Sequence, residues 1–146
     1  MKNKIILFLV ALVAVSGTLA YLSYKKDMEL REAPRPWVNM KSNLIAVEGI
    51  SGGQKISSPV VIRGSAWGYW FFEASFPVEV QDESGNVLGG SIATAEGEWM
   101  TEEFVPFTAK VEFSPGEATK GYLVLIKGNP SGLPENEDEL RIPVTF

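Results

Sequence analysis

The sequence predicts an all-β fold, a β-sandwich of about seven strands, and three observations support this prediction. After residue 42, short segments of alternating apolar and polar residues recur at roughly the 8–12-residue spacing of sandwich strands. Turns rich in glycine and proline separate these segments. No stretch beyond residue 42 keeps a helical period over three turns. With 146 residues, the chain has room for one such domain and a short appendage.

The N-terminal residues 1–26 predict a transmembrane helix ahead of the sandwich. Residues 5–24 contain no charged side chain, and this length is close to the ~20 residues that span a bilayer. Two lysines precede the run and two follow it. A short basic N-terminus stays in the cytoplasm. We therefore expect a single-pass membrane protein whose C-terminal domain lies outside the cytoplasm.

The same segment has a second interpretation, a cleaved signal peptide. Ala20 is an acceptable residue before a cleavage site, and cleavage near it would secrete the domain. Tyr21 and Tyr24 favour the uncleaved anchor instead, because tyrosine is enriched at the membrane interface. Both interpretations export the rest of the chain.

Residues 27–42 are expected to form a spacer, and residues 43–146 the sandwich domain. Two prolines in the spacer would end a helix that continues from the membrane, because proline has no amide donor. Within the domain, the aromatic-rich stretch 57–76 is expected to organise the core. It begins as a strand that is expected to break at Gly64 and at Gly68.

Each expected strand follows from its own pattern. Residues 76–82 alternate so that Phe76, Val78 and Val80 point inward, and residues 122–126 are apolar on both faces, as in a central strand. The expected strands are 44–48, 59–67, 76–82, 87–95, 104–113, 122–126 and 140–146.

Three local features refine this pattern. Residues 82–86 are expected to form a hairpin turn whose glycine adopts a positive φ. Gly89 and Gly90 interrupt the following strand and indicate a bulge or a switch between sheets. Pro143 lies on the outward face of the last strand, which favours an edge position.

Charge and composition exclude several classes of function. From residue 27 onward the chain carries 9 basic and 18 acidic residues, a net charge of −9, which disfavours binding to nucleic acid and to anionic lipid headgroups. The chain contains no cysteine and no histidine. Disulfides, zinc sites of the usual ligand sets and triads with an imidazole base are therefore excluded. We expect no cofactor and no enzyme activity.

The candidate binding surface consists of Trp67, Tyr69, Trp70 and Trp99. Strand alternation would send Trp67, Tyr69 and Phe71 to one side and Trp70 and Phe72 to the other. One or two of these rings are therefore expected to face water unless the strand is central. An exposed ring can stack on a sugar or anchor a protein contact. The alternative interpretation is that all of these rings fill the core.

Two further kinds of site receive little support from the sequence. The acid-rich loops 82–86 and 135–139 do not follow the EF-hand order and are interpreted as solvated surface rather than calcium sites. A glycosidase needs two carboxylates at a fixed separation, which nothing in the sequence provides. The glutamates near the aromatic residues are Glu73, Glu98, Glu102 and Glu103.

Several motifs along 43–146 resemble the bacterial spore-germination-associated immunoglobulin-like domain. The motifs are ISGGQKISSPV at 50–60, GSA at 64–66, FEASF at 72–76, DESGNVL at 82–88, the strand at 104–113 and IPV at 142–144. The resemblance implies an extracytoplasmic immunoglobulin-like β-sandwich that mediates contacts and has no catalytic residues.

Two functions are expected from these observations. The first is a non-enzymatic, membrane-tethered module that binds another protein of the bacterial cell envelope. The second is carbohydrate or peptidoglycan binding through the exposed aromatic residues of the candidate surface.

Overall fold

The computed structural model describes residues 21–23, 25, 39–41 and 43–146. The chain divides into two compact units, residues 1–36 and 37–146, and the second unit contains all the strands. The predicted membrane helix and the predicted spacer lie largely outside the described residues and stay predictions. Within the described residues, no helix has both the length and the hydropathy needed to cross a bilayer.

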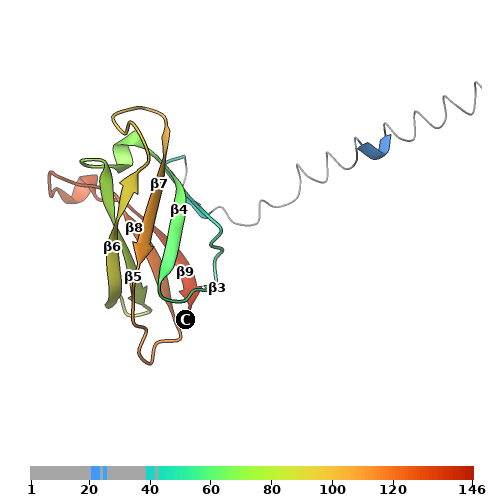
Figure 1. Ribbon diagram of the computed structural model, residues 1–146. Helices are drawn as coiled ribbons and strands as arrows, with labels where there is room; N and C mark the ends of the chain where they lie inside the picture. Colours follow the sequence, from blue (N-terminus) through green and yellow to red (C-terminus); the bar gives the residue numbers. More distant parts are fainter. Residues whose placement is uncertain (1–20, 24, 26–38, 42) are drawn as a thin grey trace, which may run out of the picture. The chain divides into compact units, whose positions relative to one another are not determined.

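Nine β-strands form a single connected sheet in the described part of the chain (Figure 1). Their order is β1-β2-β4-β7-β6-β5-β8-β9-β3, and all neighbours are antiparallel except β3 and β9. The elements are β1 Asn39–Lys41, β2 Ile45–Glu48, β3 Gln54–Lys55, β4 Val60–Trp67, the 3-10 helix η1 Gly68–Trp70, β5 Ser75–Asp82, β6 Val87–Ala95, β7 Phe104–Val111, β8 Lys120–Ile126, the 3-10 helix η2 Pro134–Asn136 and β9 Glu139–Thr145.

The all-β prediction is confirmed, and all seven expected strands are present. The structure adds β1 and β3, which contain three and two residues. Strands this short cannot display an alternating pattern, because alternation becomes recognisable only over about four residues or more. The sequence therefore assigned β1 to the spacer and β3 to a loop.

The sheet folds over at β6 and places two layers face to face. β6 pairs along its length with β5, but with β7 only at Thr94 and Ala95. The rings of Phe76 in β5 and Phe107 in β7 meet edge-on between the layers, with their centroids 4.9 Å apart. One layer therefore has the order β2-β4-β7 and the other the order β6-β5-β8-β9, an arrangement that fits an immunoglobulin-like sandwich.

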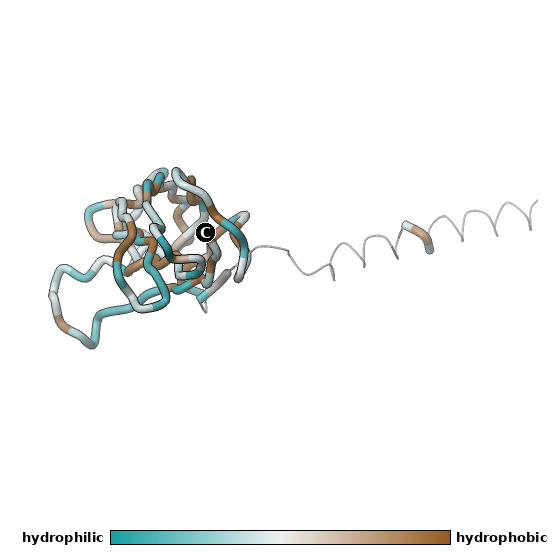
Figure 2. Tube along the Cα trace, turned by 90° about the horizontal axis from the view of Figure 1, so that it is seen from below, coloured by the Kyte–Doolittle hydropathy of each residue, from teal (hydrophilic) through white to brown (hydrophobic). Residues whose placement is uncertain are grey.

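The core between the layers is apolar, and no polar or charged residue is buried in the described part of the chain. Phe76, Val78 and Val80 of β5 are almost completely buried, as the alternation predicted. β8 lies between β5 and β9, which confirms that the 122–126 segment is a central strand. Figure 2 shows apolar and polar segments alternating along the domain, with a 127–138 loop that is hydrophilic over most of its length.

The expected break at Gly64 is wrong, because β4 runs through this residue. A Cβ atom at Gly64 would lie 2.1 Å from the Ala46 carbonyl oxygen and 2.8 Å from the Phe107 ring. The glycine therefore provides space for a neighbouring strand and for a core ring. The break at Gly68 is confirmed, since η1 begins there. A Cβ atom at Gly68 would lie 1.9 Å from the Thr101 carbonyl oxygen.

The hairpin and the irregularity in β6 were predicted correctly. Gly85 adopts a φ of +86° in the turn between β5 and β6. The β5–β6 register then shifts between Val80 and Gln81, where β6 contributes one extra residue. Farther along, β6 still pairs with β5 at Thr94, where it also pairs with β7, so of the two predicted alternatives the bulge is the one that the strand contains.

The predicted edge position of the last strand is wrong, because β3 adds to β9 on the outside. The Pro143 carbonyl accepts a hydrogen bond of 2.7 Å from the Gly53 amide. The nitrogen and the carbonyl of one strand residue point to the same side, so the missing N–H of Pro143 faces β3 and leaves the β8 ladder complete.

Candidate binding surface

Three loops meet at one end of the sandwich, which we call the loop end. They are residues 68–74 between β4 and β5, residues 96–103 between β6 and β7, and residues 127–138 between β8 and β9. The Gly68 amide donates to the Glu103 carbonyl at 3.2 Å, and the Gly128 amide donates to the Trp70 carbonyl at 2.9 Å. These backbone bonds join all three loops into one surface.

The η1 turn changes which aromatic residues face water. Strand alternation no longer applies beyond Trp67, because a 3-10 helix has three residues per turn. Tyr69 is 61% exposed, whereas Trp70 and Phe71 lie in the core. The prediction that Phe71 shares a side with Tyr69 is therefore wrong.

The four predicted surface residues thus separate into three environments. Tyr69 is exposed at the loop end, and Trp70, only 2% exposed, is part of the core. Trp67 and Trp99 are half-buried, and Trp99 packs against the core. Among the residues that the structure describes, none accepts a hydrogen bond from the Trp70 indole N–H. Trp70 thus contributes to packing, and Tyr69 is the ring available for contact.

Glu102 links two of these aromatic residues. Its carboxylate accepts a hydrogen bond of 3.2 Å from the Tyr69 hydroxyl, and its backbone carbonyl accepts one from the Trp67 indole nitrogen. The Trp67 and Tyr69 rings are nearly perpendicular, with centroids 5.5 Å apart. These contacts hold Tyr69 in one orientation on the surface.

A tight turn presents Phe72 next to Tyr69. Phe72 and Ser75 exchange two backbone hydrogen bonds of 2.9 and 3.1 Å across this turn. Glu73 and Ala74 between them have φ values of +48° and +59°. Such a pair of left-handed residues is usual for Asn-Gly in a type I′ turn and unfavourable for Glu-Ala. The strained backbone leaves the Phe72 ring 42% exposed.

The 127–138 loop is held by its own hydrogen bonds. The Lys127 amide donates to the Asp138 carbonyl at 2.8 Å and closes the base of the loop. The Asn129 side chain donates to the Leu133 carbonyl at 2.9 Å, and the Asn136 side chain donates to the Ser131 hydroxyl at 3.0 Å. A loop ordered in this way loses little conformational entropy when it binds a partner.

Exposed apolar side chains concentrate at or beside the loop end. Between residues 43 and 146, six of the eight large apolar side chains that are exposed lie there, and Met100 is the most exposed at 73%. The sequence interpretation did not select five of these six for the binding surface. For two of them, Met100 and Leu133, the available signal was an apolar residue within a polar loop. The six residues are Tyr69, Phe72, Ile92, Met100, Phe104 and Leu133.

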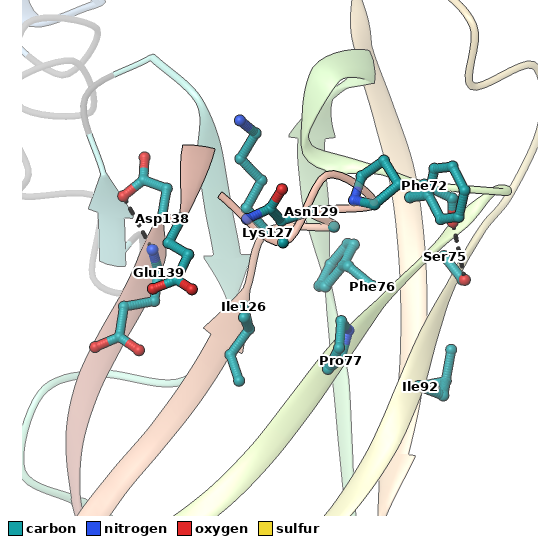
Figure 3. Close-up of a pocket in the computed structure, with 14 residues that line it drawn as sticks. Phe72, Ser75, Phe76, Pro77, Ile92, Ile126, Lys127, Asn129, Asp138 and Glu139 are labelled. Atoms are coloured by element: carbon teal, nitrogen blue, oxygen red, sulfur yellow. Dashed lines mark hydrogen bonds between the residues drawn. The ribbon is translucent and has the colours of Figure 1, made fainter. Parts of the chain in front are cut away.

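Among the hollows at the loop end of the described domain, two lie on either side of Phe72 and residues 127–130. The first, which we call the Phe72 hollow, has a volume of about 660 Å³. Figure 3 shows Phe72, Pro77 and Ile92 on one side of it and acidic residues on the other. The second, the Tyr69 hollow, has a volume of about 760 Å³ and is lined by parts of all three loops.

The loop end is strongly acidic. The three loops together contain eight carboxylate side chains and one lysine, Lys127. Such a surface repels nucleic acid, anionic lipids and anionic polymers, and attracts cationic groups. A partner surface that combines apolar and basic side chains would match it.

The acidic residues that the structure describes do not group into a metal site. In the described part of the chain, no three side chains of metal-ligating type come together. In the loop at 82–86, which lies at the opposite end, the Asp82 carboxylate accepts hydrogen bonds from the Ser84 and Asn86 amides and from the Asn86 side chain. These bonds, led by the Asn86 side chain, lower the pKa of Asp82 and stabilise the hairpin.

The four glutamates weighed as catalytic pairs have structural or solvent-exposed positions. The Glu98 carboxylate accepts a hydrogen bond of 3.0 Å from the Met100 amide, and the Glu102 carboxylate accepts one from Tyr69. Glu73 occupies the strained turn, and Glu103 is exposed before β7. The structure thus gives two of these carboxylates roles in ordering the loop end.

Comparison with known protein families supports the immunoglobulin-like assignment. A family model described as an immunoglobulin-like domain of bacterial spore germination matches residues 45–132. The match begins with β2 and ends within the 127–138 loop, so it includes the strands and loops that build most of the loop end. No curated protein and no solved structure matches the chain significantly.

Proposed function

Because the chain belongs to the family of immunoglobulin-like domains of bacterial spore germination, we propose that it is a non-enzymatic binding module. In this proposal the domain lies outside the cytoplasm and is tethered to the membrane by residues 1–26. Its loop end contacts another protein of the cell envelope.

The concentration of exposed apolar side chains at the loop end carries this proposal. Met100, Leu133 and Phe72 present aliphatic and aromatic surface on ordered loops, although leaving such groups in water is unfavourable. Burial against another protein removes this cost, and the ordered loops reduce the entropy lost on binding. Domains of immunoglobulin-like type commonly use the loops at one end of the sandwich for recognition.

A photo-crosslinking amino acid placed at single positions of the full-length protein in living cells tests the contact. Position 100 should yield a specific crosslinked protein. Position 87 is the matched control, because Val87 is also exposed, at 56%, but lies at the other end of β6. Crosslinks of equal yield and identity at both positions, or none at position 100, would contradict the proposal.

The membrane tether has a separate test. Carbonate-washed membranes should retain the full-length protein, because about 20 apolar residues span the bilayer stably. Release of a shorter soluble form would indicate cleavage near Ala20. A protease added outside the cytoplasmic membrane should digest the domain if it is exported, and protection of the domain would contradict the proposed location.

A second candidate function is the binding of a neutral glycan of the cell wall. The observation that favours it is the exposed Tyr69 ring next to the Glu102 carboxylate, since sugar sites combine a stacking ring with a hydrogen-bond acceptor. We rank it second, because Met100 and Leu133 offer a sugar neither stacking nor hydrogen bonds. Retention of the full-length protein on insoluble cell wall, lost on Tyr69→Ala, would support the glycan function. No retention would exclude it.

A further inference from the structure

We propose that the Phe72 hollow binds an extended segment of a partner protein in which an apolar side chain lies next to a lysine or arginine. The inference rests on the proposed function, because it specifies the chemistry of the partner at the same loop end. It follows from the two unlike sides of this hollow.

One side of the hollow is apolar and unusually exposed. Phe72 and Ile92 are 42% and 55% exposed, and Pro77 beside them also faces water. Pro77 and Ile92 are directly opposite each other on β5 and β6, so their side chains form one continuous apolar strip. An apolar side chain laid on this strip would be removed from water together with it.

The other side of the hollow is acidic and only partly neutralised. Asp138 forms an ion pair with Lys41, and Glu139 forms one of 3.2 Å with Arg141. Glu137 is exposed and has no ion pair among the described side chains. The Lys127 ammonium also lines this hollow, but it donates to the Asn136 carbonyl at 3.3 Å, and no ion pair joins it to a carboxylate among the described side chains. Glu137 is therefore the carboxylate of this side that is left to pair with a cation from a partner.

The two sides suit an extended segment that lies along the hollow (Figure 3). Successive side chains of an extended chain point in opposite directions, so neighbouring residues reach opposite sides. An apolar residue would contact Phe72 and Ile92 while the adjacent lysine or arginine reaches Glu137. Charge also argues against a second copy of this chain as the occupant, because residues 27–146 carry a net charge of −9.

The test uses the full-length protein in detergent and a fluorescently labelled synthetic peptide that alternates leucine and lysine. Two control peptides replace all lysines by glutamate or all leucines by serine. Ile92→Ser should weaken binding about tenfold through lost apolar burial. Glu137→Lys should weaken it about three- to fivefold, and added salt should reduce this difference.

Matched control variants lie at the opposite end of the domain. Val87→Ser removes an apolar side chain of the same exposure, 56% against 55% for Ile92, and Glu83→Lys makes the same change in charge as Glu137→Lys. Both controls should bind the leucine–lysine peptide as the wild type does. Circular dichroism should show that all four variants remain folded.

Several outcomes would overturn the inference. One is that the leucine–lysine peptide does not bind, and another is that either control peptide binds as tightly as it does. A third is that the control variants Val87→Ser and Glu83→Lys weaken binding as much as Ile92→Ser and Glu137→Lys do. Competition by soluble cell-wall fragments with equal sensitivity to Ile92→Ser would assign the hollow to a glycan. A crosslinked partner in cells combined with failure of the peptide would reject only this inference, whereas peptide binding without a cellular crosslink would reject only the proposed function.

Discussion

Gly128 lies directly against Phe72, and the contact leaves no room for a side chain. A Cβ atom at position 128 would be 2.7 Å from the Phe72 nitrogen and 2.8 Å from its Cβ atom. The Gly128 amide also donates to the Trp70 carbonyl, so the 127–138 loop and the 68–74 loop touch along their backbones. This contact places Phe72 between the Phe72 hollow and the Tyr69 hollow.

We predict that Gly128→Ala separates these two loops. The free energy of unfolding should fall by about 1–3 kcal/mol, because the added methyl group meets backbone that is held on both sides. Crosslinking from position 100 should also weaken, since the loop end loses its arrangement. Gly90→Ala is the control, because a Cβ atom there would make only ordinary contacts, the nearest at 3.5 Å. Urea unfolding followed by circular dichroism measures both variants, and equal losses would contradict the prediction.

The turn that presents Phe72 has a strained backbone, and a single substitution should relieve part of this strain. We predict that Ala74→Gly raises the free energy of unfolding by about 1 kcal/mol, because a left-handed conformation is unfavourable for alanine and free of this penalty for glycine. Ser75→Gly, outside the left-handed pair, should instead lower the stability. Thermal unfolding at matched pH checks both changes, and a destabilised Ala74→Gly variant would show that the turn is not strained.

The sequence predicted most of the fold because each long strand has a distinct pattern. Alternation in residues 76–82 and the apolar segment 122–126 specify which faces are buried, and burial dominates the stability of a sandwich. β1, with three residues, is too short to display alternation, although it pairs with the neighbouring β2. β3 depends instead on pairing with β9, which lies at the far end of the domain sequence. Contacts of that kind leave no local signal.

The candidate surface was predicted only in part, for a physical reason that begins at Gly68. The Thr101 carbonyl leaves no room for a side chain at Gly68, where the η1 turn begins. This turn places Trp70 in the core and leaves Tyr69 in water. No periodic pattern in the sequence predicts that Trp70 is buried and Tyr69 exposed. Phe72 depends on Glu73 and Ala74 in left-handed conformations, which their residue types do not favour.

Trp70 and Tyr69 are adjacent in sequence and should respond in opposite ways to truncation. We predict that Trp70→Ala lowers the free energy of unfolding by about 3–5 kcal/mol, because it empties a large site in the core. Tyr69→Ala should cost less than about 1 kcal/mol, because the ring is mostly in water. Urea unfolding measures the contribution of each ring to stability, and cellular crosslinking from position 100 measures its contribution to the partner contact. A stable Trp70→Ala protein, or a strongly destabilised Tyr69→Ala protein, would contradict the observed burial.

The Asp82 hairpin provides a prediction about pH. Hydrogen bonds from the Asn86 side chain and from nearby amides lower the pKa of Asp82 in the folded protein, whereas the unfolded chain has the ordinary value of about 3.9. The unfolded state therefore binds the proton more readily. The stability that Asp82 contributes is fully present above the unfolded value and is lost as the pH falls through the lower, folded value.

This sign leads to a measurable difference between variants. The difference in free energy of unfolding between the wild type and Asp82→Ala should be greatest at neutral pH and should shrink as the pH is lowered below about 4. Asn86→Ala removes the side chain that makes the largest contribution to the lowered pKa, so this variant should depend less on pH in the same range. Urea unfolding at a series of pH values gives both comparisons. A difference between wild type and Asp82→Ala that grows toward acid would mean that the folded state, rather than the unfolded chain, binds the proton more tightly at Asp82.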